Sequence, residues 1–156
     1  MRALSLPVLF AALVLPSAGS AQPTSRPDRG PERGVYLTVF RSPATGVEVR
    51  AGHAGAYLGL YPTVVSRDGE RGAANFLRAG GTFYLKARGA SPYVSPSLVW
   101  SLDDRWRNGA LTEVGFRGRV LGRVNGRVGA AVLTTLDRQV RVNPTIGLDV
   151  KLGGSR

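Results

Sequence analysis

The chain of 156 residues contains no cysteine and a single histidine, His53. The absence of cysteine excludes disulfide bonds and thiolate metal ligands, and one histidine gives little support for a metal centre or a Ser–His–acid triad. The glycines around His53 do not sit in a strand–helix–strand pattern, so they predict a turn rather than a nucleotide-binding loop. We therefore expect no cofactor, no metal and no catalytic residue.

The chain also lacks an apolar run of the roughly 20 residues that a membrane-spanning helix needs. The longest run, Ala3 to Leu15, follows the positive charge of Arg2 and precedes small residues at Gly19 and Ala21. This order is typical of a cleaved secretory signal peptide. We predict a signal peptide at 1–21, a flexible Pro- and Gly-rich lead-in at 22–34, a barrel domain at 35–152 and a tail at 153–156.

Acidic residues are half as many as basic ones once the predicted signal peptide is removed. Arg2 is the only charged residue of that segment, so the remaining chain has 20 basic and 10 acidic residues and a net charge of +10. Such a charge favours phosphate-rich partners. An exported chain rarely meets nucleic acid, so we expect the phosphates of membrane lipid or lipopolysaccharide as partners and no nucleic acid.

From Val35 onward the hydrophobic pattern has a period of two, with turn residues every ten to fifteen positions. Between Val140 and Leu152 the even positions are apolar and the odd positions polar or small, which places every charge on one face of a strand. The same alternation marks 93–103, 75–87, 110–124 and 127–136. It is less regular near the start, where we predict strands over 35–42, 47–51 and from residue 54.

Two predicted turns determine how the strands are connected. The phase of the alternation slips at Gly52 and His53, which favours a tight hairpin over a single long bulged strand. Further along, we predict a three-residue loop, Val124–Gly126, with its glycine left-handed. That loop pairs Val120 with Ala130 and keeps both faces consistent, whereas a two-residue turn would not. The result is an all-β fold: an eight-stranded antiparallel up-and-down barrel.

Alternation alone does not say which face is inside. The polar faces mix both charge signs with small residues, as the packed interior of a small membrane barrel does, and the apolar faces are about 9–13 residues long, close to a tilted spanning strand. The predicted connections also fall into a shorter and a longer, more charged set. The shorter set is 52–53, 88–92 and 124–126; the longer set is 43–46, 66–74, 104–109 and 137–139. We predict an interior charge network of Glu48, Arg50, Arg78, Glu113, Arg117, Arg119, Arg141 and Asp149.

In this pattern, over about 35–152, the chain resembles the small bacterial outer-membrane barrels of the OmpA and OmpX type. It departs from them at its end, where Leu152 and a glycine-rich tail stand in place of a terminal aromatic residue. The resemblance implies an outer-membrane location. Because eight strands leave room only for side chains, we expect a filled barrel without a pore, and the lack of catalytic motifs predicts no enzymatic activity. Two alternatives stay open: a soluble periplasmic, lipocalin-like barrel that binds a small apolar ligand, and a membrane-embedded lipid hydrolase. The lipid A deacylases carry His and Ser two residues apart, whereas here the residue two positions after His53 is Gly55.

The longer loops supply candidate lipid contacts. Arginine makes bidentate, charge-assisted hydrogen bonds to phosphate. We predict contacts of this kind from Arg67, Arg71, Arg105, Arg107 and Arg138. Trp106 lies between two of these arginines, and we predict that it anchors at the level of the headgroups.

Overall fold

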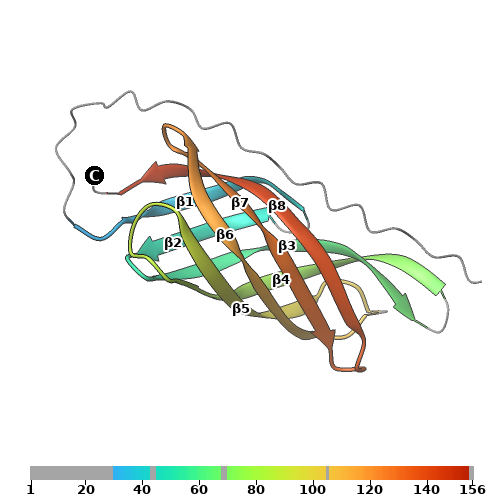
Figure 1. Cartoon of the computed structure of the whole chain (residues 1–156). Coiled ribbons are helices and arrows are strands. Elements are labelled where there is room, and N and C mark those ends of the chain that lie inside the picture. Colours follow the sequence, from blue (N-terminus) through green and yellow to red (C-terminus); the bar gives the residue numbers. More distant parts are fainter. Residues whose placement is uncertain (1–29, 43–44, 68–69, 105, 155–156) are drawn as a thin grey trace, which may run out of the picture.

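The computed structural model describes residues 30–42, 45–67, 70–104 and 106–154. Eight antiparallel strands close into one barrel in chain order, which confirms the predicted all-β fold (Figure 1). The predicted signal peptide lies outside the described residues. The strands are β1 (Arg33–Ser42), β2 (Thr45–Ala51), β3 (Ala54–Arg67), β4 (Glu70–Tyr84), β5 (Ser91–Ser101), β6 (Gly109–Leu121), β7 (Val124–Thr135) and β8 (Val140–Gly153). Within the described part of the chain, no helix is long and apolar enough to cross a membrane.

The predicted hairpin at Gly52 and His53 is confirmed. Strands β2 and β3 pair up to Ala51 and Ala54, and the two residues between them form the turn. Gly52 has a φ of 62°, a left-handed conformation that glycine adopts without the steric cost of a Cβ. The phase slip in the sequence therefore marks a change of strand.

The predicted position of the turn between β6 and β7 is wrong. The strands pair Gly118 with Gly126 and Val114 with Ala130, and the chain turns at Gly122 and Arg123. Gly122, with a φ of 50°, is the left-handed residue of this turn. A register irregularity between Arg119 and Leu121 keeps even residues opposite even ones. The prediction that both faces stay consistent across this hairpin therefore holds, although the turn lies earlier in the chain than predicted.

The connection between β3 and β4 is also much shorter than the loop predicted over 66–74. Strands β3 and β4 stay paired as far as Arg67 and Glu70, so they form the longest hairpin of the barrel. At the other end of the molecule, β1 begins at Arg33, inside the predicted lead-in. Polar residues can extend a ladder beyond the apolar stretch because the backbone hydrogen bonds do not depend on side-chain polarity.

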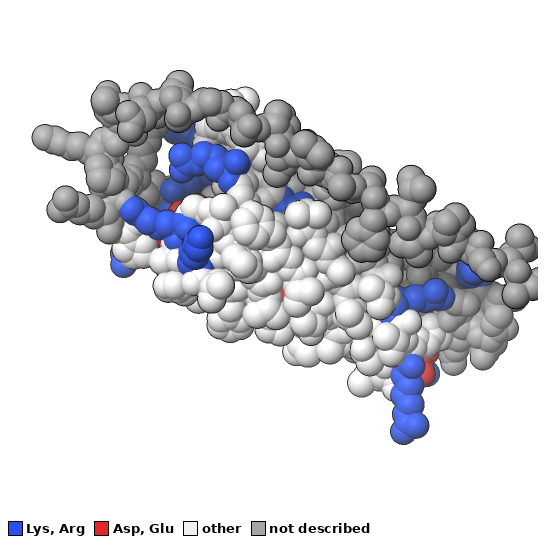
Figure 2. All heavy atoms as spheres, in the orientation of Figure 1, with Lys and Arg blue, Asp and Glu red and all other residues white. Residues whose placement is uncertain are grey.

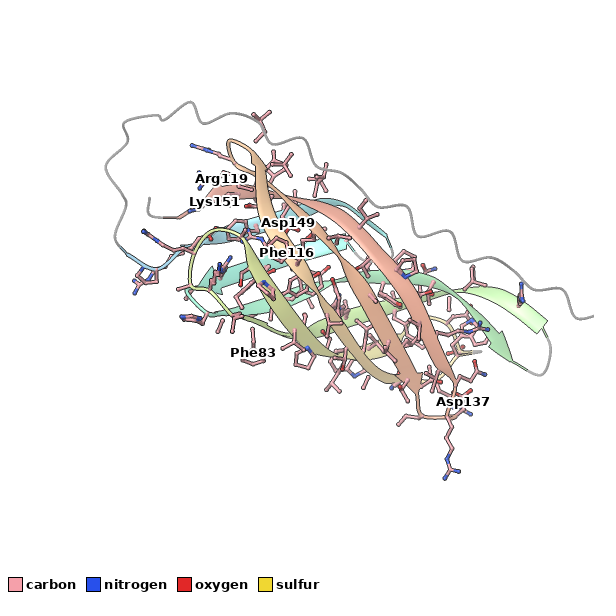
Figure 3. The ribbon with its side chains drawn as sticks, viewed as in Figure 1. Phe83, Phe116, Arg119, Asp137, Asp149 and Lys151 are labelled. Carbon is pink, nitrogen blue, oxygen red and sulfur yellow. The ribbon has the colours of Figure 1, made fainter. Side chains whose placement is uncertain are left out.

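The barrel is apolar on the outside, and its buried polar and charged side chains point inward. Along β5, Val94, Leu98 and Trp100 are exposed, whereas Ser95 and Ser97 between them are buried. Strand β8 repeats this arrangement, with Ile146 exposed beside buried residues. Figure 2 shows the same distribution on one face: Lys and Arg gather at the two ends, and a broad middle zone is almost free of charge. Phe83 and Phe116 point outward in this zone (Figure 3).

The interior has two zones of different chemistry. The zone nearer the start of β1 and the end of β8 holds buried charged residues with tyrosine and threonine. The zone at the opposite end is an apolar cluster of Tyr61, Ala74, Phe76, Val99, Leu111, Ala131 and Leu133. We call these the charged zone and the apolar zone.

Candidate functional site

One part of the charged zone is built around Arg78 on β4. Its Nη1 donates to Glu113 Oε2 at 2.8 Å, and its other nitrogens donate to Ser97 Oγ at 3.0 Å and Ser95 Oγ at 2.9 Å. Glu113 also accepts a hydrogen bond from the Tyr93 hydroxyl at 2.5 Å. All of these side chains come from β4, β5 and β6, where the alternation points them inward. A buried ion pair is stable only when hydrogen bonds satisfy its remaining atoms, as they do here.

A second part joins strands from opposite sides of the barrel. Arg127 on β7 forms ion pairs with Glu48 on β2 and with Asp149 on β8. Asp149 also lies 3.4 Å from Arg117 Nε and accepts from the Thr38 hydroxyl on β1 at 2.9 Å. The inward position of Asp149 is visible in Figure 3. These bonds cross the barrel lumen and also link the first strand to the last.

Tyrosine rings separate the guanidinium groups. Arg50 lies 3.7 Å from the ring centre of Tyr84, and Arg117 lies 4.3 Å from that of Tyr36. The Tyr84 hydroxyl donates to Glu48 Oε1 at 2.5 Å. A cation over an aromatic face is attracted by the electron-rich ring, and the effect is larger where water is excluded. The tyrosines therefore stabilise the arginines and orient the carboxylates at the same time.

Glu32 closes the charged zone at the end where β1 begins and β8 ends. Its carboxylate accepts from the Tyr36 hydroxyl and lies 3.2 Å from Arg50 and 3.5 Å from Arg117. Its backbone bonds to Ala87 and Gly52 in two adjacent turns. Burial raises the pKa of Glu32, but the Tyr36 hydrogen bond and the charges of Arg117 and Arg50 outweigh it, so its pKa lies below the ordinary value of 4.5.

With Glu32 included, the charged zone is balanced in sign. Among the described residues, four arginines and three carboxylates on the strands are nearly completely buried, and Glu32 is the fourth carboxylate, with its side chain 19% exposed. The arginines are Arg50, Arg78, Arg117 and Arg127, and the strand carboxylates are Glu48, Glu113 and Asp149. The zone can thus hold many charges without a net charge in its core.

Six of the eight predicted network residues lie in this zone: Glu48, Arg50, Arg78, Glu113, Arg117 and Asp149. Arg119 does not, because it lies beside the β6–β7 turn and is exposed. Arg141 is half-buried at the far end of β8, away from the zone. Sequence reasoning missed Arg127 and Glu32. Arg127 has the inward parity of β7 and was identifiable from it, whereas Glu32 precedes the alternating region.

The charged side chains at the barrel ends form two rims. The terminal rim, on the side where β1 begins and β8 ends, contains exposed or half-buried Arg33, Lys86, Arg88, Arg119, Arg123 and Lys151, and its one described acid is the inward-bonded Glu32. The loop rim, on the opposite side, contains Arg71, Arg107, Arg138 and Arg141 together with Asp103, Asp104 and Asp137. Arg119 and Lys151 mark the first rim in Figure 3, and Asp137 marks the second.

Those of the predicted lipid-contact arginines that the structure describes belong to the loop end. Arg107 and Arg138 lie exposed in loops, and Arg71 is exposed on β4 rather than in a loop. Arg67 ends β3, and Arg105 lies outside the described residues. Trp106 lies at the same end of the barrel. Trp106 packs against the apolar zone, and its Nε1 donates to Ala73 O at 3.3 Å, so it covers that end of the interior.

His53 is exposed in its turn, with Nδ1 3.0 Å from the carbonyl oxygen of Tyr84. Among the described residues, no group of three or more His, Cys, Asp or Glu side chains is placed to hold a metal ion.

No protein-family model, curated protein or solved structure matches the chain. The class of protein is therefore defined by the fold alone: an eight-stranded antiparallel β-barrel with a charged interior.

Proposed function

We propose that this chain is a non-enzymatic outer-membrane β-barrel that has a structural role and contacts lipid or lipopolysaccharide. The observation that carries the proposal is the inverted distribution of polarity. Arg78 and Glu113 are 0% and 1% exposed inside the barrel, whereas Leu98 on the outside is 57% exposed. A bilayer is the solvent that favours this arrangement, because a closed barrel leaves no unpaired backbone group in the hydrocarbon.

The height of the apolar surface supports the same proposal. On β8 the outward residues run from Val140 to Leu152 without a charge. Twelve steps of about 3.3 Å give about 40 Å along the strand, and a tilt of about 40° reduces this to about 30 Å across the bilayer. That is close to the hydrocarbon thickness of a typical membrane.

The filled interior argues for a barrel that does not conduct ions. Eight strands enclose a space that side chains fill, and here ion pairs occupy one zone while Phe76, Leu111 and Leu133 occupy the other. We expect no stable conductance from the purified protein in planar bilayers. Steady single-channel currents would contradict this part of the proposal.

The soluble, lipocalin-like alternative fits these contacts less well. An apolar ligand inside the barrel would have to displace Arg78 and Arg127 from their carboxylates, and the cost of unpaired buried charge is high. In water, the same protein would expose apolar side chains all around its middle zone, far more than soluble monomers tolerate.

Site-directed labelling tests the proposal, and the lack of native cysteine makes a single label specific. A nitroxide on Leu98→Cys should be reached by oxygen dissolved in lipid and protected from a water-soluble nickel reagent. The matched label on Asp104→Cys, exposed at the loop rim, should show the opposite accessibility. Accessibility of position 98 to the water-soluble reagent, in protein that fractionates without detergent, would end the membrane assignment.

A further inference from the structure

Among the described side chains, positive charge without neighbouring acids is concentrated at one end of the barrel. The described terminal rim has six cationic side chains, and its acid, Glu32, is bonded inward to Arg50 and Arg117. Among the side chains whose exposure the structure describes, the loop rim has four cationic and three acidic ones. Thus the two ends differ in net charge, although both lie next to the same apolar surface. Opposite charges close together largely cancel at a distance, so only the terminal rim presents a sustained positive field.

The β6–β7 hairpin is the most distinctive part of the terminal rim. Its tip projects beyond the neighbouring turns at the end where the C-terminus lies (Figure 1). Arg119 and Arg123 are exposed there on either side of Val120 and Leu121, which are 65% and 75% exposed. Large apolar side chains therefore lie at the same height as the cations. On the β4–β5 turn, Leu85 and Lys86 repeat this combination, with Leu85 72% exposed.

We propose that the terminal rim binds the phosphates of anionic phospholipids, with Arg119 and Arg123 as its main contacts. This inference rests on the proposed membrane location. A lipid leaflet presents phosphate directly above acyl chains, and the hairpin tip presents guanidinium groups directly beside Val120 and Leu121. Arginine suits this ligand because its planar guanidinium group can donate two hydrogen bonds to one phosphate. A soluble anion would match the charges but would leave the apolar side chains without a partner.

The position of the site differs from that expected from the sequence, which pointed to arginines at the loop rim. There, acidic residues stand between the cations: Asp137 precedes Arg138, and Asp104 lies in the same loop as Arg107. Each anionic lipid that approaches one of these arginines also approaches a carboxylate. We therefore expect the loop rim to discriminate little between anionic and neutral lipids.

The experiment measures lipid selectivity at the surface of the reconstituted barrel. The mature chain is refolded into phosphatidylcholine vesicles that contain trace spin-labelled phosphatidylglycerol or spin-labelled phosphatidylcholine, and the immobilised fraction gives the relative association constant. We expect a preference for phosphatidylglycerol of about twofold or more at low salt, because each basic residue near an anionic surface adds to the attraction. The preference should fall toward one at high salt, where exposed charges are screened.

Matched variants locate the effect. The double variant Arg119→Gln/Arg123→Gln should lose most of the preference, whereas Arg107→Gln/Arg138→Gln, two exposed arginines of the loop rim, should retain it. Arg119→Lys/Arg123→Lys should keep part of the preference, since the charge remains but the bidentate geometry does not. Equal losses in the two glutamine pairs, or no preference in the unmodified protein, would overturn the inference.

Two further outcomes separate the possible failures. Loss of the preference on adding inorganic phosphate at constant ionic strength would mean that the rim binds the free anion, which contradicts a lipid site. Failure of the unmodified protein to enter either kind of vesicle would overturn the membrane proposal as well. Incorporation without selectivity would overturn the lipid site alone.

Discussion

The two interior zones fill the same barrel by different physical means. In the apolar zone, residues such as Phe76 and Leu133 are held by close packing, which tolerates small adjustments of position. In the charged zone, Arg78 and Glu113 are held by directional contacts whose atoms must all be satisfied. The first zone should yield gradually to substitution, and the second should fail when a single partner is removed. The comparison thus separates bulk packing from specific pairing within one fold.

The largest expected effect comes from breaking one buried ion pair. Glu113→Ala removes the carboxylate from Arg78 and the acceptor from Tyr93, and should lower the free energy of unfolding by about 3–5 kcal/mol, measured by denaturant titration in detergent micelles. Asp104→Ala, exposed at the loop rim, is the control and should change it little. The double variant Arg78→Leu/Glu113→Leu should recover part of the loss, because no single charge stays buried. Similar small effects from Glu113→Ala and Asp104→Ala would contradict the pairing.

In the apolar zone, Phe76→Ala should cost about 3–4 kcal/mol through lost packing and a residual cavity. Phe76→Leu should cost much less, since a smaller apolar side chain can fill part of the space. The same unfolding titration measures both variants. A loss from Phe76→Leu as large as that from Phe76→Ala would mean that this zone depends on specific geometry as strictly as the charged one.

A smaller effect should appear as a dependence on pH. Because the pKa of Glu32 is depressed in the folded protein, its contribution to stability is fully present above about pH 4.5 and is lost as the pH falls through its lower, folded-state value. Comparing stability at pH 6 and pH 3, we expect Glu32→Gln to lose less than the unmodified chain. An unchanged pH difference in the variant would show that the ionised carboxylate of Glu32 does not stabilise the fold.

The smallest effect is expected at Arg119, which was predicted to belong to the interior network but lies outside it. Arg119→Gln should change the free energy of unfolding by no more than about 0.5 kcal/mol, since the side chain is exposed at the hairpin tip. Arg117→Gln, two residues earlier on the same face of β6, should be much more costly because it loses its contacts with Asp149 and Glu32. Thermal melts of the two variants, compared side by side, would show where along β6 the buried part of the barrel ends and the exposed terminal rim begins.

The fold was readable from the sequence because parity is a local property. Alternation over 93–103 and 140–152 separated the polar and apolar faces of each strand without knowledge of the partner strands. The β6–β7 turn was not readable in the same way, since two glycine-containing segments within five residues both allow a reversal of the chain. The choice between Gly122 and Gly126 depends on the pairing of the whole hairpin, which a local pattern does not contain.

The candidate site was predictable to the same extent, and its prediction failed at some residues for related reasons. Inward parity identified Glu48 and Asp149 and applied equally to Arg127, but parity says nothing about height in the barrel. Arg119 shares the parity of Arg117 and yet lies beyond the enclosed part. Glu32 and Trp106 stand outside the alternating segments, and only the closed barrel brings them to its two ends.

The ion pairs of Arg127 also have a consequence for the order of folding. This side chain on β7 contacts Glu48 on β2, 79 positions earlier, while Asp149 on β8 bonds Thr38 on β1, 111 positions earlier. Contacts between such distant segments cannot form in an isolated hairpin, because they require the first and last strands to meet. A chain that has formed its hairpins but has not closed the β1–β8 seam would pair Arg127 with Asp149 within the β7–β8 hairpin, but Glu48 would lack Arg127 and Thr38 would lack Asp149. The network should therefore form late and cooperatively, and should make partly assembled barrels short-lived relative to the closed one.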